Sequence, residues 1–121
     1  MIQKINSEIH EKKWGHEEWV INKKEYCLKF LYFREGCRFS MHFHSEKDET
    51  WNVDSGIFLL KYILTENAQL CEMELHPGDT VHIPKYQPHQ IICIESGRII
   101  EVSTQHFEND SFRIFPGDSQ L

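Results

Sequence analysis

The segment "MHFHSEKDETW", residues 41–51, carries two histidines one residue apart and a glutamate five residues after the second. Side chains alternate between the two faces of a β-strand, so His42 and His44 project from one face and the residues beside them from the other. Two imidazoles on one face can converge on an ion, and a histidine pair with a carboxylate such as Glu49 is a common ligand set for a divalent transition metal. A polar surface strand explains the same pattern in a chain with eight histidines.

The composition of the chain limits the classes of protein to which it can belong. It has 121 residues, of which 40% are hydrophobic and 26% charged, and a formal net charge of -6. These values predict one globular domain and argue against a nucleic-acid-binding protein, which normally presents a basic face. Residues 1–14 do not resemble a signal peptide, and no apolar run approaches the ~20 residues of a membrane span. The four cysteines form no CxxC pair, so we expect reduced thiols in a cytoplasmic protein.

Short apolar runs separated by turn residues make up most of the chain, from "YCLKFLYF" at 26–33 to "RIIEVSTQHF" at 98–107. Such runs at near-regular spacing predict an all-β sandwich or barrel. The tripeptides "DSG" at 54–56 and "ESG" at 95–97 look like tight hairpin connections. Only residues 6–19 leave room for a helical turn, and "KKWG" interrupts it.

The spacing of glycines and ligand-type residues resembles the two motifs of the cupin superfamily. The first motif, GxxxxxHxH followed by E and G, is matched at every spacing by Gly36, His42, His44, Glu49 and Gly56. The second, GxxxxxPxGxxHxxxN, is matched by Gly78, Pro84 and His89, with Tyr86 in place of glycine and Cys93 in place of asparagine. Because tyrosine is costly at positive φ, Tyr86 predicts a turn geometry different from that of the motif.

The cupin resemblance implies a small antiparallel jelly-roll β-barrel, with residues 1–20 as an N-terminal extension and residues 21–115 as the barrel. It also implies one divalent transition metal (Zn, Mn, Fe or Ni) inside the barrel, and the implied ligands are His42, His44, Glu49 and His89. Three neutral imidazoles and one carboxylate leave such a site with net positive charge, so it can act as a Lewis acid on a bound oxygen. Ligand types alone do not select the metal.

A closer resemblance, from residue 12 to about residue 115, is to the isomerase domain of type II mannose-6-phosphate isomerase. The matching positions are Trp14, Gly15, Tyr26, Lys29, Gly36, Glu101, Val102, Asp110 and Arg113. The chain departs from this pattern between His44 and Glu49, where it carries two extra residues, and it shows no nucleotidyltransferase half. Lys47, within that insert, stands near the arginine of the pattern.

Aldose–ketose isomerisation, the activity implied by this resemblance, needs an electrophile and a group that shuttles a proton. Lys29 and Glu101 are the candidate catalytic residues, because both lie among apolar residues on predicted strands. A charge inside a small barrel is costly unless it is paired or functional. Solvent-facing strand positions are the alternative interpretation of both residues.

Three further residues are candidates for substrate binding. Arg113 can bind a phosphate or order the barrel mouth through Asp110, and a surface ion pair is the alternative. Lys47 and Tyr86 are the other two candidates. We expect His82 and His106 to be structural or exposed; the sequence assigns them no role in the site.

Three functions are compatible with these features. The favoured one is a metal-dependent isomerase or epimerase of a small sugar or sugar phosphate. The alternatives are a non-catalytic cupin that binds a carbohydrate or nucleotide sugar, and a non-haem iron dioxygenase. We expect a homodimer, since the resemblance implies one and since a partner usually covers an isolated barrel edge. We expect neither nucleic acid nor membrane as a partner.

Overall fold

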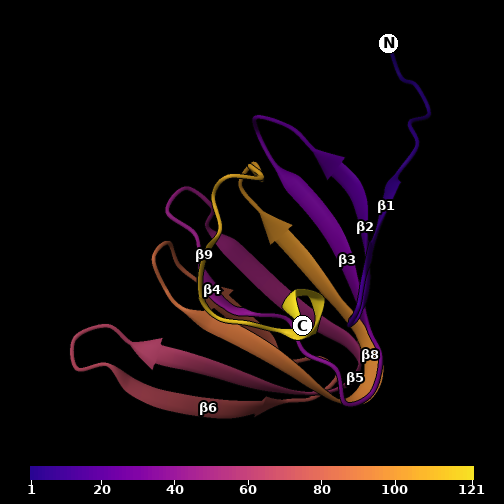
Figure 1. Ribbon diagram of the computed structural model, residues 1–121. Helices are drawn as coiled ribbons and strands as arrows, with labels where there is room; N and C mark the ends of the chain where they lie inside the picture. Colours follow the sequence, from indigo (N-terminus) through magenta and orange to yellow (C-terminus); the bar gives the residue numbers. More distant parts are fainter.

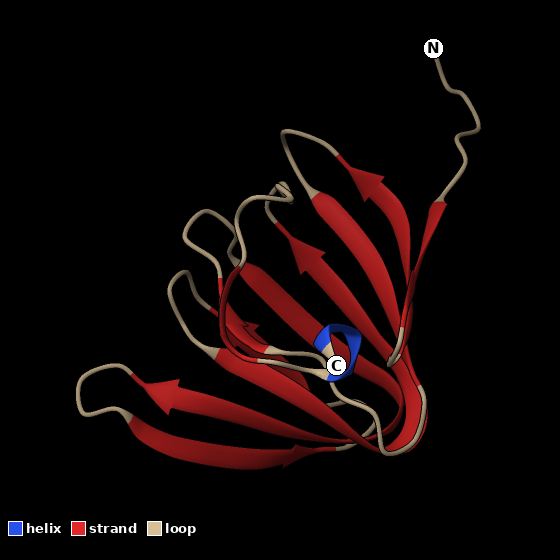
Figure 2. Cartoon of the chain, viewed as in Figure 1, coloured by secondary structure: helices blue, strands red, loops and turns tan.

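The computed structural model describes all residues from 1 to 121 and consists almost entirely of β-strands (Figures 1 and 2). The strands are β1 (Glu8–Lys12), β2 (Gly15–Asn22), β3 (Cys27–Phe33), β4 (Met41–Phe43), β5 (Glu49–Leu64), β6 (Gln69–Leu75), β7 (Thr80–Ile83), β8 (His89–Ser103) and β9 (Phe112–Phe115). A single 3-10 turn, Asp118–Gln120, follows them, and the chain has no helix long and apolar enough to cross a membrane. The all-β jelly-roll prediction is confirmed.

The strands belong to one antiparallel sheet that curls round on itself (Figure 1). Along its main path the strand order is β1-β2-β3-β8-β4-β9, while β5 pairs with β6, β7 and β8. The residues before β1 extend away from the rest of the fold (Figure 1). Strand β8 is central to this arrangement, because it pairs with β3, β4 and β5 and so contributes to both walls of the interior.

The two tripeptides predicted to be hairpin turns lie instead inside the long strands β5 and β8. The pairing of these strands shifts register around Ser55, where both strands bend together. A Cβ atom on Gly97 would lie 2.0 Å from the carbonyl oxygen of Ser55, so only glycine permits this close approach. The hairpin prediction is therefore wrong: glycine and serine serve here to bend two paired strands, and the local sequence of a sharp bend resembles that of a turn.

The N-terminal region also differs from its prediction, because residues 8–12 and 15–22 are strands of the sheet. Strand β2 pairs with β3 from Gly15↔Phe33 to Asn22↔Cys27, so no helical turn forms. Trp14 is buried and its ring stacks on Phe33 at a centroid distance of 4.4 Å. A free extension would leave this apolar surface in water, which explains why the extension is confined to residues 1–7.

The interior of the barrel has an apolar end and a polar end. The apolar core comprises Trp14, Leu31, Phe33, Trp51, Val53, Phe58, Leu60, Leu75, Ile83, Ile91, Cys93 and Ile99. The inward positions of β3 and β8 continue from this core to Lys29 and Glu101, which are also buried. The alternation of the strands therefore directs charged side chains into the same interior as the core.

Candidate metal centre

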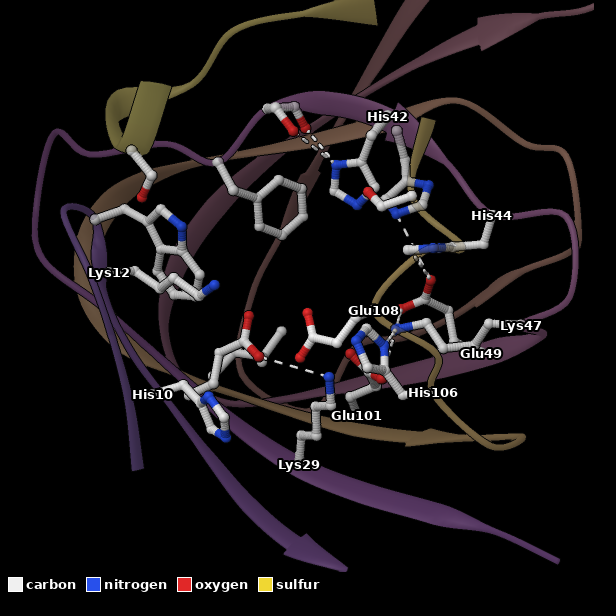
Figure 3. Close-up of a pocket in the computed structure, with 18 of the residues that line it drawn as sticks. His10, Lys12, Lys29, His42, His44, Lys47, Glu49, Glu101, His106 and Glu108 are labelled. Atoms are coloured by element: carbon white, nitrogen blue, oxygen red, sulfur yellow. Dashed lines mark hydrogen bonds and ion pairs between the residues drawn. The ribbon is translucent and has the colours of Figure 1, made fainter. Parts of the chain in front are cut away.

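Four side chains that the sequence predicts as metal ligands lie close together in the interior, and Figure 3 labels three of them, His42, His44 and Glu49. His42 and His44 come from β4 and its end, His89 begins β8, and Glu49 begins β5. One ring nitrogen from each histidine lies within 4.8 Å of the others. Oε2 of Glu49 lies 3.5 Å from Nε2 of His44 and 3.6 Å from Nε2 of His89. These four residues are called the histidine cluster below.

The second ring nitrogen of each histidine is held by a backbone carbonyl. Nδ1 of His42 donates to the carbonyl oxygen of Ser40 (2.8 Å), Nδ1 of His44 to that of Asp110 (2.5 Å), and Nδ1 of His89 to that of Gln87 (2.8 Å). An Nδ1–H that donates to a carbonyl fixes the tautomer and leaves Nε2 as the lone-pair nitrogen. All three rings are thus oriented as metal-binding histidines usually are.

Two atoms of the histidine cluster lack any hydrogen-bond partner although they are buried, and these are Oε2 of Glu49 and Nε2 of His89. The other carboxylate oxygen of Glu49 accepts a hydrogen bond of 2.6 Å from Nε1 of Trp51. An unsatisfied buried polar atom costs about 1–3 kcal/mol, so a folded protein rarely keeps two that face each other. A divalent ion between the imidazoles and the carboxylate would satisfy both atoms, and the residues therefore fit a divalent metal.

The protonation of the cluster also suits a metal. Burial lowers the pKa of His42 well below its ordinary value, the pKa of His44 to about 4 and the pKa of His89 to about 3. The three imidazoles are therefore neutral at physiological pH, which is the form that binds a metal. Burial raises the pKa of Glu49, because nothing in the cluster compensates its charge fully.

A second buried group of charges lies in the same interior and is called the lysine–glutamate group below: Lys29, Lys47, Glu101 and Glu17. Nζ of Lys47 lies 3.0 Å from Oε2 of Glu101 and 3.9 Å from Oε1 of Glu49. Burial opposes the charge of Lys47, but the carboxylates of Glu101 and Glu49 outweigh it and raise the pKa of the ammonium. Burial likewise opposes the charge of Glu101, but Lys47 and Lys29 outweigh it and lower the pKa of that carboxylate.

Lys29 is 2% exposed and faces the interior from β3, directly opposite Glu101 in the β3–β8 register. Its Nζ lies 3.5 Å from Oε1 of Glu17 and 4.1 Å from the centroid of the Trp19 ring. Nε1 of Trp19 donates a 2.7 Å hydrogen bond to the same oxygen of Glu17. The buried ammonium thus has both a carboxylate and an aromatic face as partners.

A cavity of about 310 Å³ is lined by all four members of each group, and the two groups adjoin where Nζ of Lys47 approaches Oε1 of Glu49. Of the residues predicted for substrate binding, Lys47 and Arg113 line this cavity. Arg113 lies on β9, opposite His42 in the β4–β9 register. Asp110 does not pair with Arg113 as expected, because its carboxylate accepts hydrogen bonds from residues 45–47.

Tyr86, the remaining predicted substrate-binding residue, is 61% exposed and does not line the cavity. Its φ is +66°, the left-handed conformation of the motif's glycine, so the prediction of a different turn geometry is wrong. The amide of Tyr86 donates a 2.7 Å hydrogen bond to the carbonyl of His44, which helps to explain how the surrounding structure maintains the strained backbone.

Several cavity residues were missed by the sequence analysis. Glu17 is one of them, although it stands two positions from Trp19 on β2, so strand alternation could have placed it on the same face. His106 was expected to be structural or exposed, yet it lines the cavity with Nδ1 3.4 Å from Nζ of Lys47, and burial lowers its pKa to about 3. Glu108 belongs to the loop between β8 and β9, where no periodic pattern signals direction, and Figure 3 shows it directed into the cavity.

Comparison with known proteins identifies the fold. No family model matches the sequence, and no curated protein gives a significant match. The solved structures that resemble the chain include oxalate decarboxylase from Bacillus subtilis, with a TM-score of 0.79, 16% identity and 89% of this chain covered. CapF, a capsular polysaccharide assembling protein from Staphylococcus aureus, gives a TM-score of 0.77, 15% identity and 93% coverage. The chain has the cupin fold.

The chain corresponds to 30% of the length of the oxalate decarboxylase and 33% of the length of CapF. At 15–16% identity the likeness concerns the fold alone. Another structure of the B. subtilis enzyme is described by its Mn(II) centres. The histidine cluster of the present chain is defined independently, by the geometry of its own side chains.

Proposed function

We propose that this cupin is a metal-dependent isomerase or epimerase of a small sugar or sugar phosphate. The observation that carries the proposal is one cavity that is lined by both the histidine cluster and the lysine–glutamate group, which adjoin at Lys47 and Glu49. The volume of about 310 Å³ lies at the lower end of the range for small-molecule sites. A ligand rich in oxygen atoms could reach both groups at once.

The histidine cluster would hold one divalent ion, for which Zn, Mn, Fe and Ni remain the candidates. When bound, such an ion polarises a substrate oxygen and stabilises the negative charge that develops on an enediolate. The Nδ1 hydrogen bonds of the three histidines keep their Nε2 atoms directed at one point. The hydrogen bond from Trp51 keeps the other oxygen of Glu49 turned away from that point.

Lys29 and Glu101 are the proposed proton-transfer residues, and their surroundings assign them different parts. Glu101 accepts hydrogen bonds from Lys47 and Ser103 at the same oxygen, 3.0 Å and 3.2 Å away, and its lowered pKa makes it a weak base. Its carboxylate is therefore ionised, and it is the candidate to take the proton from the substrate carbon while it also holds Lys47 in place. Lys29 has no such hydrogen bond to Glu101, so its ammonium is the better candidate to donate a proton to a substrate oxygen.

Arg113 is proposed to bind the anionic group of a phosphorylated substrate. It is exposed at the cavity, and its guanidinium forms no hydrogen bond or ion pair with another residue of the chain. A free guanidinium suits phosphate oxygens, which it can bind through two parallel hydrogen bonds. We also propose that the protein is a cytoplasmic homodimer and that its partners include neither nucleic acid nor a membrane.

The test is an isomerisation assay on protein reconstituted with each candidate metal, using aldoses, ketoses and their phosphates in D₂O. Incorporation of deuterium next to the carbonyl reports proton transfer even where net turnover is slow. Lys29→Gln should abolish exchange and leave metal binding intact, and Lys61→Gln, on β5 and outside the cavity, is the matched control. Metal-loaded protein that exchanges no proton with any member of the panel would contradict the proposal.

A binding cupin without turnover is the second candidate, and the pairing of the lysines favours it. Lys29 and Lys47 already have carboxylate partners, and the carboxylate best placed as a base is a weak one. This alternative predicts that a sugar phosphate binds without exchange and that Lys29→Gln changes only its affinity. Oxygen uptake by the iron-loaded protein would instead indicate a dioxygenase.

A further inference from the structure

The loop between β8 and β9, residues 104–111, is fastened to the insert at residues 45–48 that separates two predicted metal ligands. The fastening side chain is Asp110, which is 3% exposed. Its carboxylate accepts hydrogen bonds from Ser45 N (2.8 Å), Ser45 Oγ (2.8 Å), Glu46 N (3.0 Å) and Lys47 N (3.0 Å). One side chain thus holds three consecutive residues of the insert.

The backbone of the same residue acts on the histidine cluster. The carbonyl oxygen of Asp110 accepts the 2.5 Å hydrogen bond from Nδ1 of His44. Asp110 is therefore in contact with a predicted ligand through its main chain and with the insert through its side chain. The insert in turn carries Lys47, whose ammonium reaches Glu101 at 3.0 Å.

Other contacts prevent the loop from moving independently of the insert. Asp48 and Thr104 exchange two hydrogen bonds of 3.0 Å, one from the amide of Thr104 and one to its hydroxyl. Asn22 on β2 binds both backbone groups of His106, at 2.8 Å and 3.0 Å. The loop is thus held at three points, and Asp110 is the one next to His44.

From this geometry we infer that Asp110 is a positioning residue for the metal site. Its carbonyl orients the ring of His44, and its carboxylate keeps the loop and the insert in the register that places that carbonyl. Asp110 does not line the cavity, so its effect passes through His44. The inference rests on the proposed metal binding at the histidine cluster. A carboxylate that merely stabilises a surface turn would leave metal affinity unchanged, which separates the two roles.

The variant Asp110→Asn tests the inference, because asparagine has the same shape but loses the charge and one acceptor oxygen. Asp79→Asn is the matched control: Asp79 accepts a 2.7 Å hydrogen bond from the amide of His76 in an exposed turn that does not line the cavity. The full chain is titrated with Mn²⁺ and with Zn²⁺. We expect Asp110→Asn to weaken binding by about 10–100-fold, as loss of a partner that orients a ligand does, and Asp79→Asn to leave it unchanged.

A double variant shows whether the effect passes through His44. In the background of His44→Gln, the substitution Asp110→Asn should cost little further metal affinity, because the ring that Asp110 orients is already gone. Additive losses would overturn the inference. If Asp110→Asn does not fold, Ser45→Ala removes one donor of the same network and should give a smaller loss in the same direction.

The outcomes separate this inference from the proposed function. A wild-type chain that binds neither metal contradicts the metal site itself. A wild-type chain that binds metal, together with a folded Asp110→Asn that binds it equally well, overturns the positioning role alone. Equal losses in Asp110→Asn and Asp79→Asn would do the same.

Discussion

The two buried polar groups of the cavity differ in what their charges face. In the lysine–glutamate group every buried charge has a partner of opposite sign in the chain, the longest separation being the 3.5 Å from Lys29 to Glu17. In the histidine cluster a carboxylate oxygen and an imidazole nitrogen face each other without a hydrogen bond. The first group is complete without a ligand, whereas the second becomes complete only when a cation lies between its members.

The difference arises although one strand, β8, contributes to both groups. Strand β8 supplies His89 at its start and Glu101 near its end, and both side chains point inward. The groups differ because only one of them contains lysines. The comparison therefore predicts opposite changes in the stability of the metal-free protein when a carboxylate of each group is replaced by an amide.

The largest expected effect is the loss of stability on neutralising the paired carboxylate. Glu101→Gln leaves Lys47 buried with only the more distant Glu49 as a partner. Removing one member of a buried ion pair typically costs roughly 3–5 kcal/mol of the free energy of unfolding. Urea denaturation of the metal-free protein measures this loss, and Glu95→Gln, an exposed position of the same strand, is the control. Equal stabilities of the two variants would show that the pair contributes nothing.

Removing a member of the histidine cluster should act on metal affinity and spare the fold. We expect His89→Gln to lower the affinity by more than the roughly 10–100-fold that loss of an orienting partner costs. His82→Gln is the control, because His82 is exposed and pairs only with Asp48. Calorimetric titration measures both variants. A His89→Gln protein that keeps wild-type affinity would remove His89 from the ligand set.

The corresponding substitution of Glu49, whose Oε2 has no hydrogen-bond partner, should change the stability in the opposite direction to Glu101→Gln. In Glu49→Gln the amide can keep the hydrogen bond from Trp51 and donate to Nε2 of His89, which lies 3.6 Å from the present oxygen. Satisfying these atoms should stabilise the metal-free protein by about 1–3 kcal/mol, while metal binding is lost. Thermal unfolding after chelation gives the sign directly. A destabilised Glu49→Gln would mean that the two carboxylates are equivalent.

The pH dependence of metal affinity distinguishes the ligand types. Burial raises the pKa of Glu49, so protons compete with the metal for this carboxylate first as the pH falls. The pKa values of His44, about 4, and His89, about 3, keep the imidazoles neutral over that range. We expect affinity to decrease by up to about tenfold per pH unit below the raised pKa of Glu49. Affinity that is independent of pH down to pH 5 would contradict the assignment.

The strand periodicity was enough to bring His42 and His44 to one face, and the cupin motif spacing added Glu49 and His89. The direction of Lys47 could not be predicted, because the insert that carries it has no periodicity and is held by Asp110, a residue 63 positions away. The bends at 54–56 and 95–97 were misread because glycine and serine favour turns and bulges alike. Local patterns thus predicted which side chains gather in the histidine cluster, while contacts distant in sequence determine the rest of the cavity.

The binding of one divalent ion by the histidine cluster is tested most directly by titrating the chelator-treated protein with Mn²⁺, Fe²⁺, Ni²⁺ and Zn²⁺. At least one of these ions should bind with a stoichiometry of about one per chain and raise the unfolding temperature as its concentration increases. Neither effect should occur in Glu49→Gln. Failure of all four ions to bind the folded wild-type protein, or undiminished binding in Glu49→Gln, would contradict the assignment of the site.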